Sequence, residues 1–90
     1  MLRGYSMDYN IEFTKEFEKS IKKLKKKDFL LFTRVQKKLE ELIVNPNHYK
    51  PLRNVLFGFR RLHIGSFVLI YTIEEKTVII ISLDHHNKAY

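Results

Sequence analysis

The sequence predicts an α+β fold in which a helical hairpin packs on a mainly antiparallel four-stranded sheet. Apolar residues recur every three or four positions between residues 15 and 44, as on one face of a helix. They alternate with polar residues, or run continuously, in residues 9–13 and 59–83, as in strands. The resulting order is β-α-α-β-β-β, with no internal repeat or linker. We therefore expect one domain over residues 1–90, in which residues 1–7 form an N-terminal extension and Met7 could be the true start.

The first strand and the first helix meet at Thr14. Tyr9, Ile11 and Phe13 alternate with polar residues and predict a short, half-buried strand. Thr14 is typical of an N-cap, because its side chain can accept a hydrogen bond from the first turn. A helix from about Lys15 to Lys26 follows, and its apolar face consists of Phe17, Ile21 and Leu24.

A second helix begins at Asp28, another capping residue, and ends before the pair Asn45 and Pro46. Its apolar face consists of Phe32, Val35, Leu39 and Leu42. The short junction between the helices predicts an antiparallel hairpin. A polar loop that holds both prolines follows, from Asn45 to Asn54.

The last part of the chain predicts three strands. These are Phe59–Ile64, Phe67–Ile73 and Thr77–Leu83, with a tight turn or bulge at Gly65 and Ser66. The last strand, TVIIISL, is the most apolar, so we expect it at the centre of the sheet. The helices should cover one face of this sheet and leave the other partly open.

The composition indicates a basic protein. Seventeen Lys and Arg against ten Asp and Glu give a net charge of +7, which favours nucleic acid, ribosome or an acidic protein as partner. The absence of cysteine excludes disulfides and thiolate metal sites and suits a reducing cytoplasm. No apolar run reaches the roughly 20 residues of a membrane helix, and no signal-peptide core is present.

Three groups of residues could carry function. The first is a lysine run at the end of the first helix: Lys22, Lys23, Lys25, Lys26 and Lys27. It could contact phosphates, or it could be a solvated helix end whose cations complement the helix dipole.

The second group is at the start of the strand Phe59–Ile64. Arg61 and His63 share a face, and a guanidinium with a nearby imidazole suits a phosphate. Arg60 should point to the opposite face. The alternative is that Arg61 and His63 are merely exposed to solvent.

The third group is the C-terminal stretch DHHNKAY, residues 84–90. Adjacent histidines lack the spacing of a metal pair, so we expect no zinc site. His85, His86 and Tyr90 could serve proton transfer, or the stretch could be a polar tail.

The element order and two motifs resemble the RelE/ParE toxin superfamily, in particular archaeal RelE toxins, over residues 9–90. The family pattern R-x-R-x-G-x-Y-R-x-x-Y corresponds to RLHIGSFVLIY at residues 61–71, and H-R-x-x-x-Y corresponds to HHNKAY at residues 85–90. The resemblance implies a toxin that cleaves mRNA in the ribosomal A site without a metal or cofactor. It also implies a RelB-type antitoxin that wraps around the toxin and inhibits it.

The resemblance suggests a role for each candidate residue. Arg61 would stabilise the phosphate, His63 would orient or stabilise it, and His86 and Tyr90 would transfer protons. The residues expected to contact RNA or the ribosome are Lys22, Lys23, Lys25, Lys26, Lys27, Lys50, Arg53 and Lys88.

Three positions depart from the family pattern. Val68 stands where many RelE proteins have an arginine, His63 replaces a basic Arg or Lys, and His86 replaces an arginine. Two alternatives therefore stay open: a ParE-like toxin that inhibits a topoisomerase, and an inactive relative that only binds antitoxin or RNA. An acidic, partly disordered antitoxin is expected to bind apolar helix residues 29–32.

Overall fold

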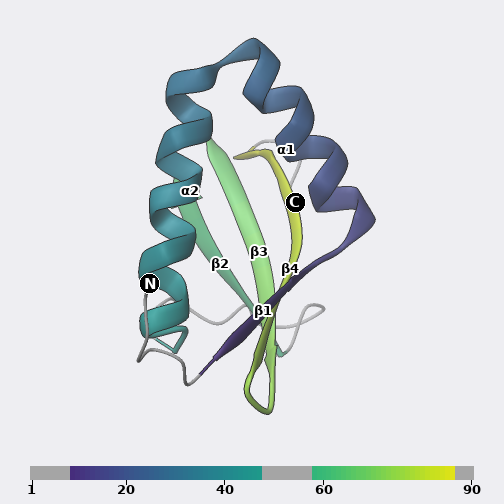
Figure 1. Ribbon diagram of the computed structural model, residues 1–90, viewed down its shortest axis with the longest axis vertical. Helices are drawn as coiled ribbons and strands as arrows, with labels where there is room; N and C mark the ends of the chain where they lie inside the picture. Colours follow the sequence, from purple (N-terminus) through teal and green to yellow (C-terminus); the bar gives the residue numbers. More distant parts are fainter. Residues whose placement is uncertain (1–8, 48–57, 87–90) are drawn as a thin grey trace.

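The computed structural model describes residues 9–47 and 58–86. The predicted N-terminal extension, residues 1–7, lies outside them. Two helices pack on one face of a four-stranded sheet (Figure 1). The elements are β1 Asn10–Phe13, α1 Lys15–Lys27, α2 Phe29–Val44, β2 Phe59–Ile64, β3 Phe67–Glu74 and β4 Thr77–His85.

The sheet is mixed, with the strand order β1-β4-β3-β2. β1 pairs with β4 in parallel, whereas β4 with β3 and β3 with β2 are antiparallel. The prediction of a mainly antiparallel sheet with the last strand inside it is therefore confirmed. A strand in this place is covered by helices and flanked by strands on both sides, which explains its run of apolar residues.

Both helices begin at the predicted caps. The Thr14 side chain accepts a hydrogen bond from the Phe17 N–H at 3.1 Å, and Asp28 accepts one from the Leu31 N–H at 3.1 Å. Asp28 also ends α1, because its own N–H donates to the Leu24 carbonyl. One residue thus forms the whole junction, which produces the expected hairpin.

The core lies between the helices and the facing side of the sheet. Phe17 and Leu24 from α1 and Val35 and Leu42 from α2 are buried there. They meet strand residues that are also buried: Leu62, Ile64, Leu69, Tyr71, Val78, Ile80 and Leu83. Tyr71 is fully buried, and its hydroxyl donates to the Pro46 carbonyl at 2.5 Å, which ties the end of α2 to the middle of the sheet.

A β-bulge interrupts β4. Tyr71 pairs with Ile80 but Ile70 pairs with Ser82, so Ile81 is an extra residue on β4. The extra residue reverses the alternation, so that Ile80 faces the helices and Ser82 faces away from them. The Thr14 hydroxyl donates to the Ile81 carbonyl at 2.6 Å and thus gives the bulge a hydrogen-bond partner.

One predicted strand boundary needs correction. β4 extends to His85 rather than ending at Leu83, because Val68 pairs with Asp84 and Phe67 pairs with His85. We call the sheet side away from the helices the outer face; it is partly open, as expected, because His63 is exposed and Arg61 is partly exposed. Val68 and Ile70 at its centre are only 1% and 8% exposed, and Phe59 and Ile81 pack against them.

No helix within the described part of the chain is long and apolar enough to cross a membrane.

Candidate functional site

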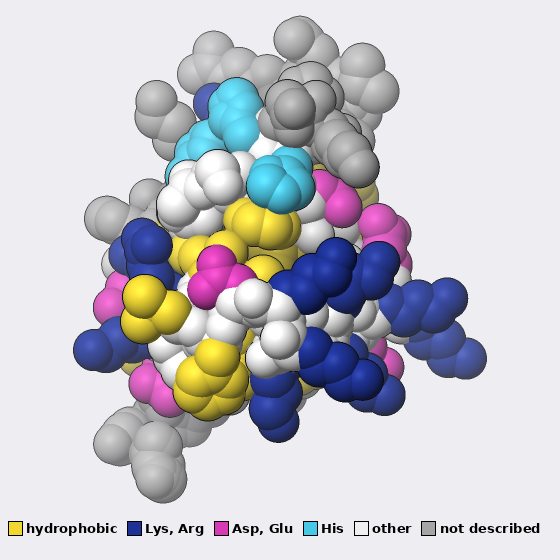
Figure 2. Space-filling view, turned by 90° about the horizontal axis from the view of Figure 1, so that it is seen from above, with side chains coloured by type: hydrophobic (Ala, Val, Ile, Leu, Met, Phe, Trp, Pro, Cys, Tyr) yellow, Lys and Arg dark blue, Asp and Glu magenta, His cyan; other side chains and the backbone are white. Residues whose placement is uncertain are grey.

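The predicted lysine run lies at the end of the molecule where the two helices join. All five of its side chains are exposed, and they occupy the last two turns of α1. In the view onto this end, basic side chains gather on one side and histidines on another, with hydrophobic side chains between them (Figure 2). Lys25 places its ammonium 5.6 Å from the centre of the Phe32 ring, a cation–π contact.

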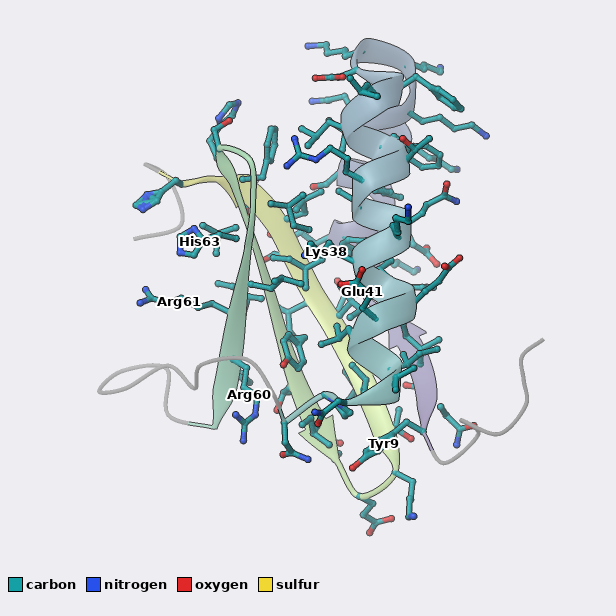
Figure 3. The ribbon with its side chains drawn as sticks, turned by 90° about the vertical axis from the view of Figure 1, so that its left-hand side faces the viewer. Tyr9, Lys38, Glu41, Arg60, Arg61 and His63 are labelled. Carbon is teal, nitrogen blue, oxygen red and sulfur yellow. The ribbon has the colours of Figure 1, made fainter. Side chains whose placement is uncertain are left out.

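Arg61 and His63 both project from β2 on the outer face (Figure 3). Because Arg61 and His63 are two positions apart on one strand, their Cα atoms lie about 7 Å from each other. His63 is exposed and Arg61 is partly exposed, whereas Leu62 between them is buried in the core. The shared face that alternation predicted is therefore present.

The strand register extends this pair into two rows on the outer face. His63 pairs with Val68, which in turn pairs with Asp84. Arg61 pairs with Ile70, which in turn pairs with Ser82. Val68, at the position of the family arginine, is 1% exposed, so an apolar side chain closes the middle of the first row.

His86 lies next to His63, although the two are 23 positions apart in the sequence. The His86 N–H donates to the Ser66 carbonyl at 2.8 Å, which fastens the end of β4 to the turn between β2 and β3. The two imidazole rings are then 5.2 Å apart, centre to centre, with planes inclined by 31°. The outer face thus combines a guanidinium with two neighbouring imidazoles, groups that can bind an anion and exchange protons with it.

His85 points the other way. Its ring lies 4.3 Å from the Phe67 ring, on the helix side of the sheet. The two adjacent histidines therefore belong to opposite faces, and only His86 joins His63.

Arg60 is separate from Arg61, as predicted. It pairs with Tyr71, whose side chain belongs to the core, and its guanidinium donates to Asn47 Oδ1 at 3.4 Å. Figure 3 shows it well away from Arg61 and His63.

The bulge places two further side chains on the outer face that the sequence pattern does not predict. Ser82 is buried at 8% exposure on the outer face, and Asp84 lies in the same row as His63. Neither is predicted there, because strict alternation from Val78 and Ile80 would place both toward the helices.

The remaining candidates, Lys50, Arg53, Lys88 and Tyr90, lie outside the described residues. Within residues 9–47 and 58–86, no group of three or more His, Asp or Glu side chains converges as metal ligands would.

The structure thus has a helical hairpin on one face of a mixed sheet, with lysines where the helices join and two neighbouring imidazoles on the outer face. This architecture places the chain in the class of small toxins that the sequence resembles. The family model described as ParE toxin of type II toxin-antitoxin system, parDE, matches residues 11–90. The chain therefore belongs to this family and is a toxin of the RelE/ParE superfamily.

Individual relatives agree with this assignment. The chain is 45% identical over 85 residues to a protein of Methanocaldococcus jannaschii named as toxin RelE4, covering 91% of this chain and 90% of the relative. It is 28% identical to a chain of the toxin-antitoxin complex RelBE2 from Mycobacterium tuberculosis, with a TM-score of 0.74, covering 88% of this chain and 99% of that one. A chain of the intact Escherichia coli RelBE complex shares the fold, with 23% identity, a TM-score of 0.72 and coverage of 86% and 95%.

Proposed function

We propose that the protein is a ribosome-dependent endoribonuclease that cleaves mRNA in the A site and so inhibits translation. The observation that carries this proposal is the outer-face cluster: His63 and His86 with rings 5.2 Å apart, and Arg61 two residues away on the same face. Cleavage of RNA by its own 2′-OH requires a base, an acid and a group that stabilises charge on the phosphate. These side chains can supply all three without a metal.

In this mechanism Arg61 binds the scissile phosphate and stabilises the charge that develops on its oxygens. His86 transfers a proton, together with Tyr90, and His63 orients the phosphate beside it. The 5.2 Å separation of the imidazoles also allows His63 to take one of the proton transfers itself. Arg61 and His63 lie on a strand that is paired in the sheet, and the backbone hydrogen bond of His86 to Ser66 holds the second imidazole, which favours positioning of the cluster before RNA binds.

The cluster is tested by single-turnover cleavage on mRNA-programmed ribosomes. Arg61→Ala should slow cleavage by about two to three orders of magnitude through loss of a preorganised charge. Arg60→Ala is the matched control, because it removes the same group from the opposite face, and it should retain activity. His63→Ala and His86→Ala should each cost roughly a hundredfold, and the double variant should cost much less than their product.

Each variant is first checked for a wild-type melting profile. Equal effects of the Arg60 and Arg61 substitutions would contradict the proposed site. Failure of the wild-type protein to cleave programmed ribosomes would contradict the activity itself.

A second candidate function is inhibition of a topoisomerase, which the match to the ParE family model favours. The buried Val68 in place of the family arginine is compatible with this alternative and with an inactive relative. Induced expression in growing cells separates the functions, because the ribonuclease should stop protein synthesis first and a topoisomerase inhibitor should stop DNA replication first.

We further propose that a RelB-type antitoxin neutralises the protein in the cytoplasm. The RelBE complexes among its structural relatives support such a partner, and the net charge of +7 favours an acidic one. The sequence predicted contact along residues 29–32, but Leu31 is buried at 9% exposure and Phe32 packs against the core. Phe29 and Leu30, 59% and 74% exposed, are the residues of this segment that remain accessible.

A further inference from the structure

A pocket separate from the outer-face cluster lies between the last turns of α1 and the paired ends of β3 and β4. Its volume is about 330 Å³. The residues that line it are Ser20, Lys23, Leu24, Lys27, Phe67, Leu83, Asp84 and His85. We call it the α1–β4 pocket.

The pocket combines an apolar floor with a basic rim. Leu24 and Leu83 are core residues, and Phe67 packs against the same core, so the floor is apolar. Lys23 and Lys27 are exposed and lie four residues apart, which places both ammonium groups on the same side of α1. His85 is also exposed, with its ring held against Phe67 at 4.3 Å.

We propose that the α1–β4 pocket binds one nucleotide of single-stranded RNA. A base is flat and fits against an aromatic ring over apolar residues, and its phosphate is an anion that suits two lysines at the rim. A pocket of this volume has the size range of small-molecule sites. The inference rests on the proposed function, because it assigns to the same RNA substrate a second contact beyond the cleavage site.

The arrangement favours a nucleotide over an acidic peptide. A carboxylate would use only the two lysines at the rim. A nucleotide uses the aromatic pair and the apolar floor as well, and its phosphate can remain at the lysine rim. Of the five lysines in the run, only Lys23 and Lys27 line this pocket. These two would therefore contact the nucleotide, whereas the other three would not.

The fold places the pocket where it can bind the same strand as the cluster. His85 and His86 are consecutive, yet one ring lies against Phe67 and the other beside His63. An RNA strand passing the end of β4 could therefore place one nucleotide at the outer face and another in the pocket. A single strand can follow this path, because its unstacked bases can turn outward toward different sites on a protein.

The test measures the binding of a short, fluorescently labelled oligoribonucleotide to the purified toxin at several salt concentrations. The double variant Lys23→Ala/Lys27→Ala should weaken binding about tenfold. It should also reduce the salt slope, the steepness with which the logarithm of the binding constant falls with the logarithm of salt concentration, by roughly 0.7 for each phosphate that the two lysines neutralise. The matched control is Lys15→Ala/Lys19→Ala, which removes two exposed charges with the same spacing from the same helix and outside the lysine run. It should retain most of the slope, because these lysines do not line the pocket.

The aromatic contact is tested at His85. His85→Ala should weaken binding about tenfold through loss of stacking, and His85→Phe should restore it. Equal losses in the two lysine pairs, or failure of phenylalanine to restore binding, would overturn the nucleotide pocket. Binding of a glutamate-rich peptide that depends on Lys23 and Lys27, without such binding of RNA, would overturn it in favour of a protein partner.

The single-turnover cleavage assay separates this inference from the proposed function. If the wild type cleaves normally but the two double lysine variants lose RNA binding equally, the pocket is refuted and the ribonuclease proposal still stands. A wild-type protein that neither cleaves nor binds RNA would refute both.

Discussion

Thr14 connects the start of α1 to the bulge of β4, and its removal should cost more than the loss of a helix cap. Its hydroxyl oxygen accepts from the Phe17 N–H at 3.1 Å and its hydroxyl hydrogen is donated to the Ile81 carbonyl at 2.6 Å. Thr14→Ala removes both bonds but keeps the backbone bond from its own N–H to the Ile80 carbonyl at 3.1 Å.

The expected magnitude follows from the two bonds. Loss of an N-cap costs typically about 1 kcal/mol. Loss of the partner of a partly buried carbonyl adds about 1 kcal/mol. Thr14→Ala should therefore lower the free energy of unfolding by about 2 kcal/mol. For a domain of this size, that corresponds to a melting temperature lower by roughly 8–16 °C.

Two matched variants isolate the contribution of the bulge. Asp28→Ala removes the cap of α2, whose side chain accepts from the Leu31 N–H, and should cost only about 1 kcal/mol. Thr14→Ser keeps a hydroxyl that can make both bonds and should remain close to wild type. Urea unfolding followed by circular dichroism gives all three values, provided that the slopes with denaturant agree. A cost for Thr14→Ala no greater than that for Asp28→Ala would refute the role assigned to the Ile81 contact.

Two further predictions concern the core and the partner surface. Tyr71→Phe should lower the free energy of unfolding by about 1–2 kcal/mol, because the buried Pro46 carbonyl loses its donor. Thermal melting measures this loss, and an unchanged melting temperature would contradict it. Phe29→Ser combined with Leu30→Ser should weaken binding of the antitoxin encoded beside the toxin at least tenfold in calorimetry, whereas Val44→Ser, a 67% exposed residue at the other end of α2, should not; equal effects would exclude this surface.

The helices and β2 could be predicted from the sequence because their signals are local. The caps Thr14 and Asp28 act within one turn, and the residue before Pro46 avoids helical conformation for steric reasons. The strand Phe59–Ile64 has the predicted bounds, and its alternation correctly separates Arg60 from Arg61. Each of these features depends on residues close in the chain.

The phase of β4 could not be predicted in the same way. Residues 78–81 are all apolar, since both faces of this strand meet buried side chains, so the pattern carries no information about which residue faces the helices. The bulge at Ile81 is stabilised by Thr14, which is 67 residues away. A hydrogen bond over this separation leaves no local signal in the sequence.

The bulge also decides which histidine belongs to the outer-face cluster. With strict alternation from Val78 and Ile80, His86 would face the helices and His85 would face the side of His63. The extra residue reverses this arrangement, and the observed ring contacts, His86 with His63 and His85 with Phe67, both follow the reversed phase. Bulges beside functional sites commonly redirect side chains in this way. The hydrogen bond from Thr14 to the Ile81 carbonyl therefore stabilises more than a helix start: it holds the backbone geometry that brings the two imidazoles together.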